Sequence, residues 1–491
     1  MIQMQIQTTI DLPPDAASVI ESMRSIGYSF HDAVADVVDN SVSAGAENVD
    51  VMCDYDCPVP YLSIFDDGCG MDDAELKKAM TYGSKNPNQV RSAEDLGRYG
   101  LGLKVASLSQ CAQLTVISKK DGKMSAYEWN LEVIRSMNSN ASTWSVVVID
   151  PLSIRGMQIE KLVAAEHGTL VIWRNFDILM IGSDSISSSL RIRLQNTRDH
   201  LALVFHRYIK RGGPMSDARN VTFRVNEVVL KPRDPFLTEN SHTIPKISED
   251  LPYHGKTIHI KGYILPHINQ LSPEEIETLG GKGRMQSLQG FYIYRNKRLI
   301  LAGGTWFKMS GKKQLQNLAR VMIDIPNDMD VEWSVDVKKS SLYLPEDFKS
   351  QLKPVLKDVL ETSTRVYTRR GKKSMGSEKR FIVRVDHKDY VTYEVNRNHP
   401  LLVNLLNNPE VSREFSTILS MIEHSIPYDD IRNDFEQKLK PNTLSDDEMD
   451  QYTQMALVRM QYTGEKAESL LDMEPFCLYP QVIQKLIEKG Y

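Results

Sequence analysis

Three short stretches near the N-terminus carry side chains that could together bind a nucleotide. They are residues 36–40, 66–71 and 97–104, in that order. The first holds two carboxylates and a carboxamide, the second holds aspartates and two glycines, and the third holds three glycines ahead of a lysine. Each stretch alone is common on protein surfaces, so only their order and spacing indicate a shared site.

The first stretch lies in a segment whose apolar residues recur at helical spacing, from residue 28 to 46. Asp36 and Asn40 are four residues apart and therefore share one side of the predicted helix. The amide oxygen of Asn40 is a hard ligand suited to Mg²⁺, and the carboxylate of Asp36 can orient or deprotonate a water that attacks a phosphate. A solvated polar stripe is the simpler explanation of this stretch taken alone.

The second stretch follows two apolar runs, residues 49–52 and 61–65, that predict strands. The second run ends at Asp66, whose carboxylate can accept a hydrogen bond from the exocyclic amine of a planar ring. Gly68 and Gly70 let the backbone approach such a ring closely. An ordinary surface turn is the alternative for this stretch.

The third stretch places its glycines directly before a helix-like run, residues 103–108. Glycines in that position expose backbone N–H groups to an anion, and Lys104 adds a positive charge. No strand precedes the glycines, which argues against a dinucleotide fingerprint, and a Walker-type phosphate loop is absent.

In this order, and with Gly168 and Thr169 ahead of another apolar run, the stretches resemble the GHKL ATPases. That group includes DNA gyrase, heat-shock chaperones, histidine kinases and MutL proteins. Residues 82–85 and 96–104 look most like its Microrchidia (MORC) type, including the bacterial relatives. The resemblance implies a mixed α/β (α+β) fold: an N-terminal Bergerat-type α/β sandwich, then a transducer-like α+β domain of the ribosomal S5 type.

The resemblance also implies roles for individual residues. Asn40 would bind Mg²⁺, Asp66 would read the adenine amino group, and Thr169 would support that contact through water. Asp36 stands where hydrolysing members usually carry glutamate, which sets its carboxylate back by one methylene, so a slow or non-hydrolysing switch is an alternative. The other nucleotide-binding residues implied are Gly68, Gly70, Met71, Ser84, Lys85, Gly97, Tyr99, Gly100, Leu101, Gly102 and Lys104, several of them in a lid over the phosphates.

The chain divides into four predicted parts. The first two are an ATP-binding domain over residues 1–180, with a mobile loop at 77–96, and a transducer-like domain over 181–345. They are followed by a helix and basic linker over 346–380, with an exposed linker at 364–380, and by a helical C-terminal module over 381–491. The second part is expected to hold a helix over 185–211 and strands at 221–225, 256–265, 290–294 and 320–325.

Two segments of the second part carry notable charges. Residues 333–341 are the candidate for a transducer loop, in which Lys338 or Lys339 would reach the terminal phosphate and act with Asp36 in catalysis. Solvated surface lysines are an equal alternative. Residues 294–300 also resemble the MORC-type second domain, and their charges predict a hairpin turn rather than a phosphate contact.

Composition fits this interpretation. The chain has 491 residues, 41% of them hydrophobic and 25% charged, which is ordinary for a soluble globular protein. A net charge of −5 argues against general coating of nucleic acid. The five cysteines lack paired metal-ligand spacing, and no apolar run is long enough to span a bilayer, so we expect reduced thiols and a cytoplasmic protein.

These inferences predict an ATP-dependent conformational switch or dimeric clamp with ATP and Mg²⁺ as cofactors. The resemblance implies a homodimer that acts on DNA, in a DNA-modification or phage-defence setting, and the basic segment 364–380 could contact the DNA backbone without base specificity. Residues 381–491 carry no catalytic signature, which favours binding of a partner protein, and no membrane partner is expected. A chaperone-like remodelling factor or a nucleotide-dependent scaffold is the alternative. A histidine kinase is less favoured because no helix with a phospho-accepting histidine precedes the site, and a topoisomerase is less favoured because no cleavage tyrosine is identifiable.

Overall fold

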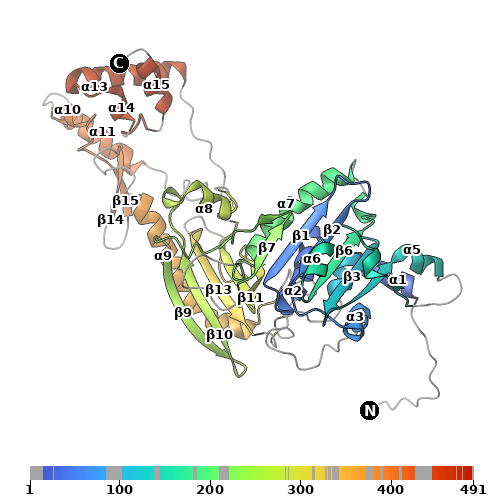
Figure 1. Cartoon of the computed structure of the whole chain (residues 1–491). Coiled ribbons are helices and arrows are strands. Elements are labelled where there is room, and N and C mark those ends of the chain that lie inside the picture. The colour runs from blue at the N-terminus through green and yellow to red at the C-terminus, as the bar shows by residue number, and fades with distance from the viewer. Residues whose placement is uncertain are drawn as a thin grey trace. The chain divides into compact units, whose positions relative to one another are not determined.

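The computed structural model describes most of the chain (Figure 1). By their internal contacts the residues form two compact units, Met1–Arg365 and Val366–Tyr491. The four-part division given above stays a prediction. The residues outside the description are 1–14, 26, 84–101, 138–143, 181–184, 210–219, 282–283, 286, 312–315, 327–328, 330–332, 334–341, 372–379, 387–390, 408–411, 426–444, 472, 478 and 489–491.

The first unit contains an eight-stranded sheet with strand order β5-β4-β3-β6-β2-β1-β7-β8. All neighbouring strands are antiparallel except β1 and β7, which are parallel. Because β6 lies between β2 and β3, Thr169 pairs with both Asp66 and Ser118, and three strand ends meet at one edge. The strands are β1 Asn48–Asp54, β2 Tyr61–Asp66, β3 Gln113–Lys120, β4 Lys123–Asn130, β5 Val147–Val148, β6 Gly168–Arg174, β7 Thr222–Val225 and β8 Val228–Val229.

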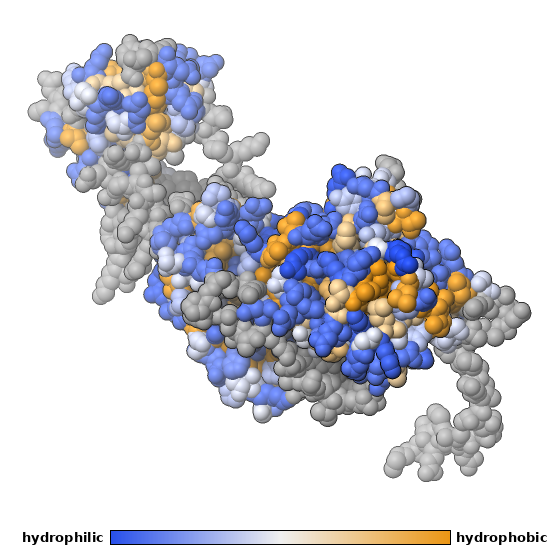
Figure 2. Space-filling view, viewed as in Figure 1, coloured by the Kyte–Doolittle hydropathy of each residue, from blue (hydrophilic) through white to orange (hydrophobic). Residues whose placement is uncertain are grey.

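Helices pack on both faces of this sheet. Side chains alternate along the strands, so that Ile64 joins the core beneath α1, α2, α4 and α7 while Phe65 joins the core beneath α6. Figure 2 shows mostly hydrophilic side chains on the visible face, with hydrophobic patches over the first sheet. The helices are α1 Ala16–Arg24, α2 Phe30–Ser43, α3 Asp73–Met80, α4 Gly102–Leu108, α5 Leu131–Met137, α6 Ile159–Ala164 and α7 Ile186–Val204, with short 3-10 helices at Pro151–Ser153 and Ile178–Met180.

Helix α2 carries the first predicted stretch, and its sequence explains its place. The Ser29 hydroxyl accepts a hydrogen bond from the Asp32 N–H and caps the first turn. The apolar side chains of Val34, Val37 and Val38 are buried in the core, and each such burial contributes about 1.5–3 kcal/mol. The helix predicted within residues 28–46 is therefore confirmed.

The first unit also contains a five-stranded sheet with strand order β12-β11-β13-β10-β9. Helix α9, Glu346–Gly371, runs along this sheet (Figure 1). Its approach to β10 is close because Gly262 lacks a side chain: a Cβ there would lie 2.6 Å from Cγ2 of Val359. The strands are β9 Ile244–Tyr253, β10 Lys256–Ile264, β11 Gly290–Arg295, β12 Arg298–Ala302 and β13 Ala319–Ile325, with α8 at Pro273–Thr278 and a 3-10 helix at Ile268–Gln270.

The structure corrects four expectations. The helix expected over 185–211 is α7, which ends at Val204 and packs in the core of the first sheet, so its assignment to the second part is wrong. The strand expected at 221–225 is β7, which pairs with β1 in the first sheet, so its assignment to the second α+β region is wrong. The loop expected at 77–96 begins inside α3, because the capping box of Asp72 and Glu75 starts a helix that continues to Met80. The exposed linker expected over 364–380 is wrong in its first part, because α9 continues to Gly371.

The second unit is mainly helical, as predicted, but it also contains a two-stranded sheet of β14 and β15. Its helical core is formed by side chains of α13, α14 and α15 and of the segment that joins α14 to α15. None of the helices in the described part of either unit is both long and apolar enough to cross a membrane. The elements are β14 Ile382–Asp386, β15 Val391–Val395, α10 Val403–Leu406, α11 Ser412–His424, α13 Asp446–Thr463, α14 Ala467–Leu470 and α15 Pro480–Glu488.

Candidate functional site

The structure brings the first two predicted stretches together. Asp36 and Asn40 lie on α2, and Asp66 ends β2. A hydrogen bond joins the two stretches, because the Ser41 hydroxyl donates to Oδ2 of Asp66 over 2.8 Å. Eight of the predicted residues lie outside the described part of the chain: Ser84, Lys85, Gly97, Tyr99, Gly100, Leu101, Lys338 and Lys339.

The carboxylate of Asp66 is buried, with 4% of the residue exposed. Burial raises its pKa to about 6, although the hydrogen bonds from Ser41 and from the Gly68 N–H oppose that shift. The Gly68 N–H donates to Oδ1 over 3.0 Å. A buried carboxylate at the end of a strand, held by two donors, is a fixed acceptor of the kind that can read a ring amine.

The glycines beside Asp66 fill places where a side chain would not fit. Gly70 has φ +63°, and a Cβ there would lie 2.0 Å from the carbonyl oxygen of Lys119. A Cβ on Gly168 would lie 2.3 Å from the carbonyl oxygen of Asp66. The loop after β2 is therefore pressed directly against the ends of β3 and β6, and only glycine allows that approach.

A second set of hydrogen bonds closes the same edge of the sheet. The Ser118 hydroxyl accepts from the Met71 N–H over 2.8 Å and lies 2.9 Å from the hydroxyl of Thr169. Nδ1 of His167 lies 2.6 Å from the carbonyl oxygen of Gly68. Thr169 is therefore held beside Asp66, as its predicted role requires, although the water-mediated contact itself stays a prediction.

Asp36 is almost completely buried, with 4% exposed, and Oδ2 of its carboxylate accepts a 2.9 Å hydrogen bond from the Tyr28 hydroxyl. Asn40 is exposed and donates its side-chain N–H to the backbone carbonyl of Asp36 over 3.3 Å. A Cβ on Gly102 would lie 4.0 Å from Oδ2 of Asp36, so α4 begins beside this carboxylate. One residue of the third stretch thus lies next to the first stretch.

Lys104 lies in a different environment from the one predicted. It is 1% exposed, its Nζ donates to the carbonyl oxygen of Ala79 over 2.6 Å, and the same Nζ lies 5.7 Å from the ring centroid of Tyr82. Its proposed contact with phosphate stays a prediction, and in this arrangement Lys104 joins α4 to the end of α3.

Several residues that complete the site were not predicted from the sequence. Ser41 and Ser118 hold Asp66 and Thr169, and Tyr28 holds Asp36. Arg298 was interpreted as part of a hairpin turn; the hairpin is confirmed, but the arginine is buried against α2, where its Nε donates to Oδ1 of Asp39 over 2.8 Å. Ser41 directly follows Asn40, so its position in the sequence could have indicated that it belongs to the site. Nothing in the sequence around Arg298 indicates that this arginine contacts α2.

Among the described residues, one set of three side chains has donor atoms close enough to hold a metal ion. His31, Asp32 and His200 place these atoms within 4.8 Å of one another, and Asn40 is not one of the three. Burial lowers the pKa of His200 to about 4, reinforced by His31 and opposed by Asp32. The 3.3 Å contact between Nε2 of His200 and Oδ1 of Asp32 accounts for their proximity without a metal.

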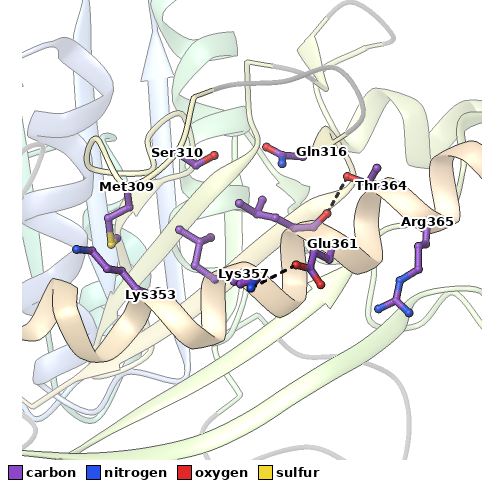
Figure 3. Close-up of a pocket in the computed structure, with 10 residues that line it drawn as sticks. Met309, Ser310, Gln316, Lys353, Lys357, Glu361, Thr364 and Arg365 are labelled. Atoms are coloured by element: carbon purple, nitrogen blue, oxygen red, sulfur yellow. Dashed lines mark hydrogen bonds and ion pairs between the residues drawn. The ribbon is translucent and has the colours of Figure 1, made fainter. Parts of the chain in front are cut away.

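One cavity borders the loop that follows Asp66, and another lies among residues outside the candidate site. One of about 500 Å³ lies outside the Asp66 loop and is lined in part by Gly68, Cys69 and His167. Another of about 690 Å³ is a groove between α9 and the side chains of Met309, Ser310 and Gln316, with Lys353 and Lys357 among the lining residues (Figure 3). The second groove contains none of the predicted site residues.

Comparison with known proteins assigns a family to the region that contains both halves of the site. A family model described as histidine kinase-, DNA gyrase B- and HSP90-like ATPase matches residues 28–169, from Tyr28 beside Asp36 to Thr169 beside Asp66. Residues 28–169 form a GHKL ATPase domain. This confirms the resemblance stated from the motifs and the mixed α/β class of the fold.

Individual relatives match shorter segments of the chain. DNA mismatch repair protein MutL from Thermoanaerobacter sp. (strain X514) is 29% identical over 113 residues, which are 22% of this chain and 17% of that protein. ATPase morc-1 from Caenorhabditis elegans is 32% identical over 94 residues, 19% of this chain and 11% of the relative. The MutL protein of Caldanaerobacter subterraneus subsp. tengcongensis is 33% identical over 81 residues, which are 16% of this chain and 12% of that protein. The chain spans less than a fifth of the length of these relatives.

Proposed function

We propose that the GHKL domain binds Mg²⁺·ATP between Asp66 and Asn40, hydrolyses it slowly, and acts as an ATP-dependent conformational switch. The observation that carries this proposal is the hydrogen bond from Ser41 to Asp66. It fixes a buried acceptor for a base against the helix turn that carries the amide of Asn40. A base held by Asp66 and a metal-bound phosphate held by Asn40 are then kept at a fixed separation, because Ser41 ties the end of β2 to α2.

The base end of this site uses the carboxylate of Asp66. Ser41 and the Gly68 N–H hold it in place, so it is oriented before the base arrives. The adenine amino group donates to this carboxylate, and Thr169 supports the ring beside it. Gly68 and Gly70 let the loop that holds Asp66 pack closely, because a Cβ on Gly68 would lie 2.7 Å from Cβ of Ala44 and one on Gly70 would lie 2.0 Å from the Lys119 carbonyl oxygen.

The metal end of this site uses Asn40. Its side-chain nitrogen is committed to the Asp36 carbonyl, so its amide oxygen is the atom that faces a cation. Beside phosphates Mg²⁺ prefers oxygen ligands and keeps several bound waters. The amide of Asn40 can supply one oxygen ligand, and the exposed position of this residue leaves room for the waters. Bound Mg²⁺ supplies charge neutralisation at the phosphates.

Asp36 is the residue proposed to orient and deprotonate the attacking water. The hydroxyl of Tyr28 fixes Oδ2, which keeps the carboxylate in one orientation. Because aspartate is one methylene shorter than glutamate, we expect turnover to be slow. Lys338 or Lys339, both outside the described residues, is the proposed contact to the terminal phosphate.

The conformational switch needs ATP to favour one arrangement, because a ligand that binds two states equally shifts neither. We propose that ATP favours a closed homodimer that acts on DNA. The DNA partner is proposed by analogy with the MutL relatives, which are DNA mismatch repair proteins. Mass measurement with and without a non-hydrolysable ATP analogue tests the dimer; an unchanged monomer at micromolar concentration contradicts it.

The hydrolytic step is tested by comparing the parent with Asp36→Asn, Asp36→Glu and Asn40→Ala. Asp36→Asn is expected to reduce kcat by about 100-fold or more while the Kd for Mg²⁺·ATP stays within about three-fold. Asp36→Glu should keep or raise turnover, because it restores the longer reach. Asn40→Ala should weaken binding only when Mg²⁺ is present, so that addition of EDTA removes its difference from the parent. Equal turnover in the parent and Asp36→Asn would contradict the proposal.

A further inference from the structure

Arg298 belongs to the second sheet but lies against the first. It begins β12, and its guanidinium reaches two carboxylates of α2 that are more than 250 positions earlier in the chain. Nε donates to Oδ1 of Asp39 over 2.8 Å, and Nη2 lies 3.6 Å from Oδ1 of Asp36. These contacts join the two sheets of the first unit directly at the candidate site.

All three charged groups are buried. Arg298 is 3% exposed, Asp36 4% and Asp39 1%. Burial of Arg298 opposes its charge, but the two carboxylates outweigh that effect and raise its pKa above the ordinary value. Removal of one member of such a group leaves an uncompensated buried charge, so the members depend on one another.

Asp39 and Asp36 lie at different distances from the guanidinium of Arg298. The shorter contact makes Asp39 the anchor of Arg298, and the longer one leaves Asp36 in the field of the cation without a direct hydrogen bond from it. The other oxygen of Asp36 is held by Tyr28. The Asp36 carboxylate is therefore contacted from both sides, by Tyr28 of its own domain and by Arg298 of the second sheet.

We propose that Arg298 is a positioning residue for Asp36, through which the β11–β12 hairpin controls turnover of ATP but not affinity for it. This rests on the proposed function, because it assumes that Asp36 activates the water. A shift of the hairpin would carry Arg298 away from α2 and change the orientation of the Asp36 carboxylate, which is proposed to activate the water. By linkage, a nucleotide state that favours one setting of Asp36 favours one position of the hairpin.

The test measures kcat, KM and thermal midpoint for Arg298→Met, Arg298→Lys and the double variant Asp39→Asn/Arg298→Met. Arg298→Met should reduce kcat by about 30-fold or more and change KM by less than about three-fold. Arg298→Lys keeps a positive charge and should recover part of the lost turnover. The double variant removes one anion together with the cation, so its thermal midpoint should return toward the parent while its kcat stays low.

A matched control separates positioning from general loosening between the sheets. Arg207 forms an ion pair with Asp324 of β13, another arginine–aspartate pair that reaches the second sheet, and no contact with Asp36 is seen for it among the described residues. Arg207→Met should leave kcat within about three-fold of the parent. An equal loss of turnover in Arg207→Met and Arg298→Met would overturn the inference.

The remaining outcomes are also decisive. A double variant whose turnover recovers together with its stability would show that Arg298 only supports the fold. A raised KM with unchanged kcat in Arg298→Met would show that Arg298 binds phosphate. Failure of the parent itself to bind or hydrolyse ATP contradicts the proposed function instead, whereas an active parent with an equally active, folded Arg298→Met contradicts only this inference.

Discussion

The base side and the phosphate side of the candidate site are held in different ways. Asp66 and Thr169 are fixed by Ser41, Gly68 and Ser118, all within the first sheet and the helix that covers it. The carboxylates of α2 are instead paired with an arginine of the second sheet. From this difference we propose that recognition of adenine is complete within the first domain, whereas the proposed chemistry at Asp36 depends on where the second sheet lies.

The first prediction concerns the rigidity of the base side. Gly70→Ala should lower the free energy of unfolding by about 3 kcal/mol or more, because its φ is positive and its Cβ would overlap the Lys119 carbonyl oxygen. Gly122 has φ +73° with open space around it, so Gly122→Ala should lower it by only about 1 kcal/mol. Gly102→Ala, on the phosphate side, should change it least. Urea unfolding followed by circular dichroism measures all three; equal losses for Gly70 and Gly122 would contradict the tight contact.

The second prediction breaks base recognition alone. Asp66→Asn should weaken ATP binding on the order of 100-fold, which corresponds to the loss of a hydrogen bond to a charged group. Purine riboside triphosphate lacks the amino group, so the parent should bind it about as weakly as Asp66→Asn binds ATP. Asp121→Asn, a change in an exposed turn, is the matched control and should bind like the parent. A variant that still prefers ATP over the purine analogue would show that another group reads the base.

The third prediction uses the raised pKa of Asp66. Because the ionised carboxylate accepts the hydrogen bond and its pKa is about 6, ATP affinity should stay level above about pH 7 and fall roughly ten-fold per pH unit below 6. The stability effect has the opposite sign. A folded pKa above the ordinary value of 3.8 means that this residue's contribution to stability is full below about pH 4 and is lost as the pH rises through 6.

Protonation of Asp66 in mild acid should weaken ATP binding but stabilise the fold. A loss of binding in mild acid is therefore not explained by an effect of Asp66 on unfolding. Isothermal titration calorimetry from about pH 5 to about pH 8 measures the affinity. Asp66→Asn is the control, because it reports the titration of ATP itself. A parent curve parallel to that of the variant would contradict the assignment of Asp66.

The smallest predicted effect concerns the support around Thr169. Ser118→Ala removes the hydroxyl that accepts from the Met71 N–H and contacts Thr169, and it should weaken ATP binding about three- to five-fold. Ser153→Ala removes an exposed hydroxyl that is not part of the proposed site, and it should leave the Kd for ATP unchanged. A loss larger than that of Asp66→Asn would place the base nearer Ser118 than we propose.

The same contrast explains what the sequence could predict. Helix α2, the strand that ends at Asp66 and the adjacent glycines were predicted because each depends on residues close together in the chain. The placement of β7 failed because its parallel partner β1 lies more than 150 positions earlier, and pairing at that range leaves no local pattern. Arg298 was predicted in a hairpin, but nothing in its neighbourhood indicates that its charge is buried against Asp39.

The structure of the chain crystallised with Mg²⁺ and a non-hydrolysable ATP analogue tests the central claim most directly. We predict the adenine amino group within hydrogen-bonding distance of Asp66 and a Mg²⁺ ion about 2.1 Å from the amide oxygen of Asn40. A nucleotide bound elsewhere, or one whose base lies away from Asp66, would contradict the claim.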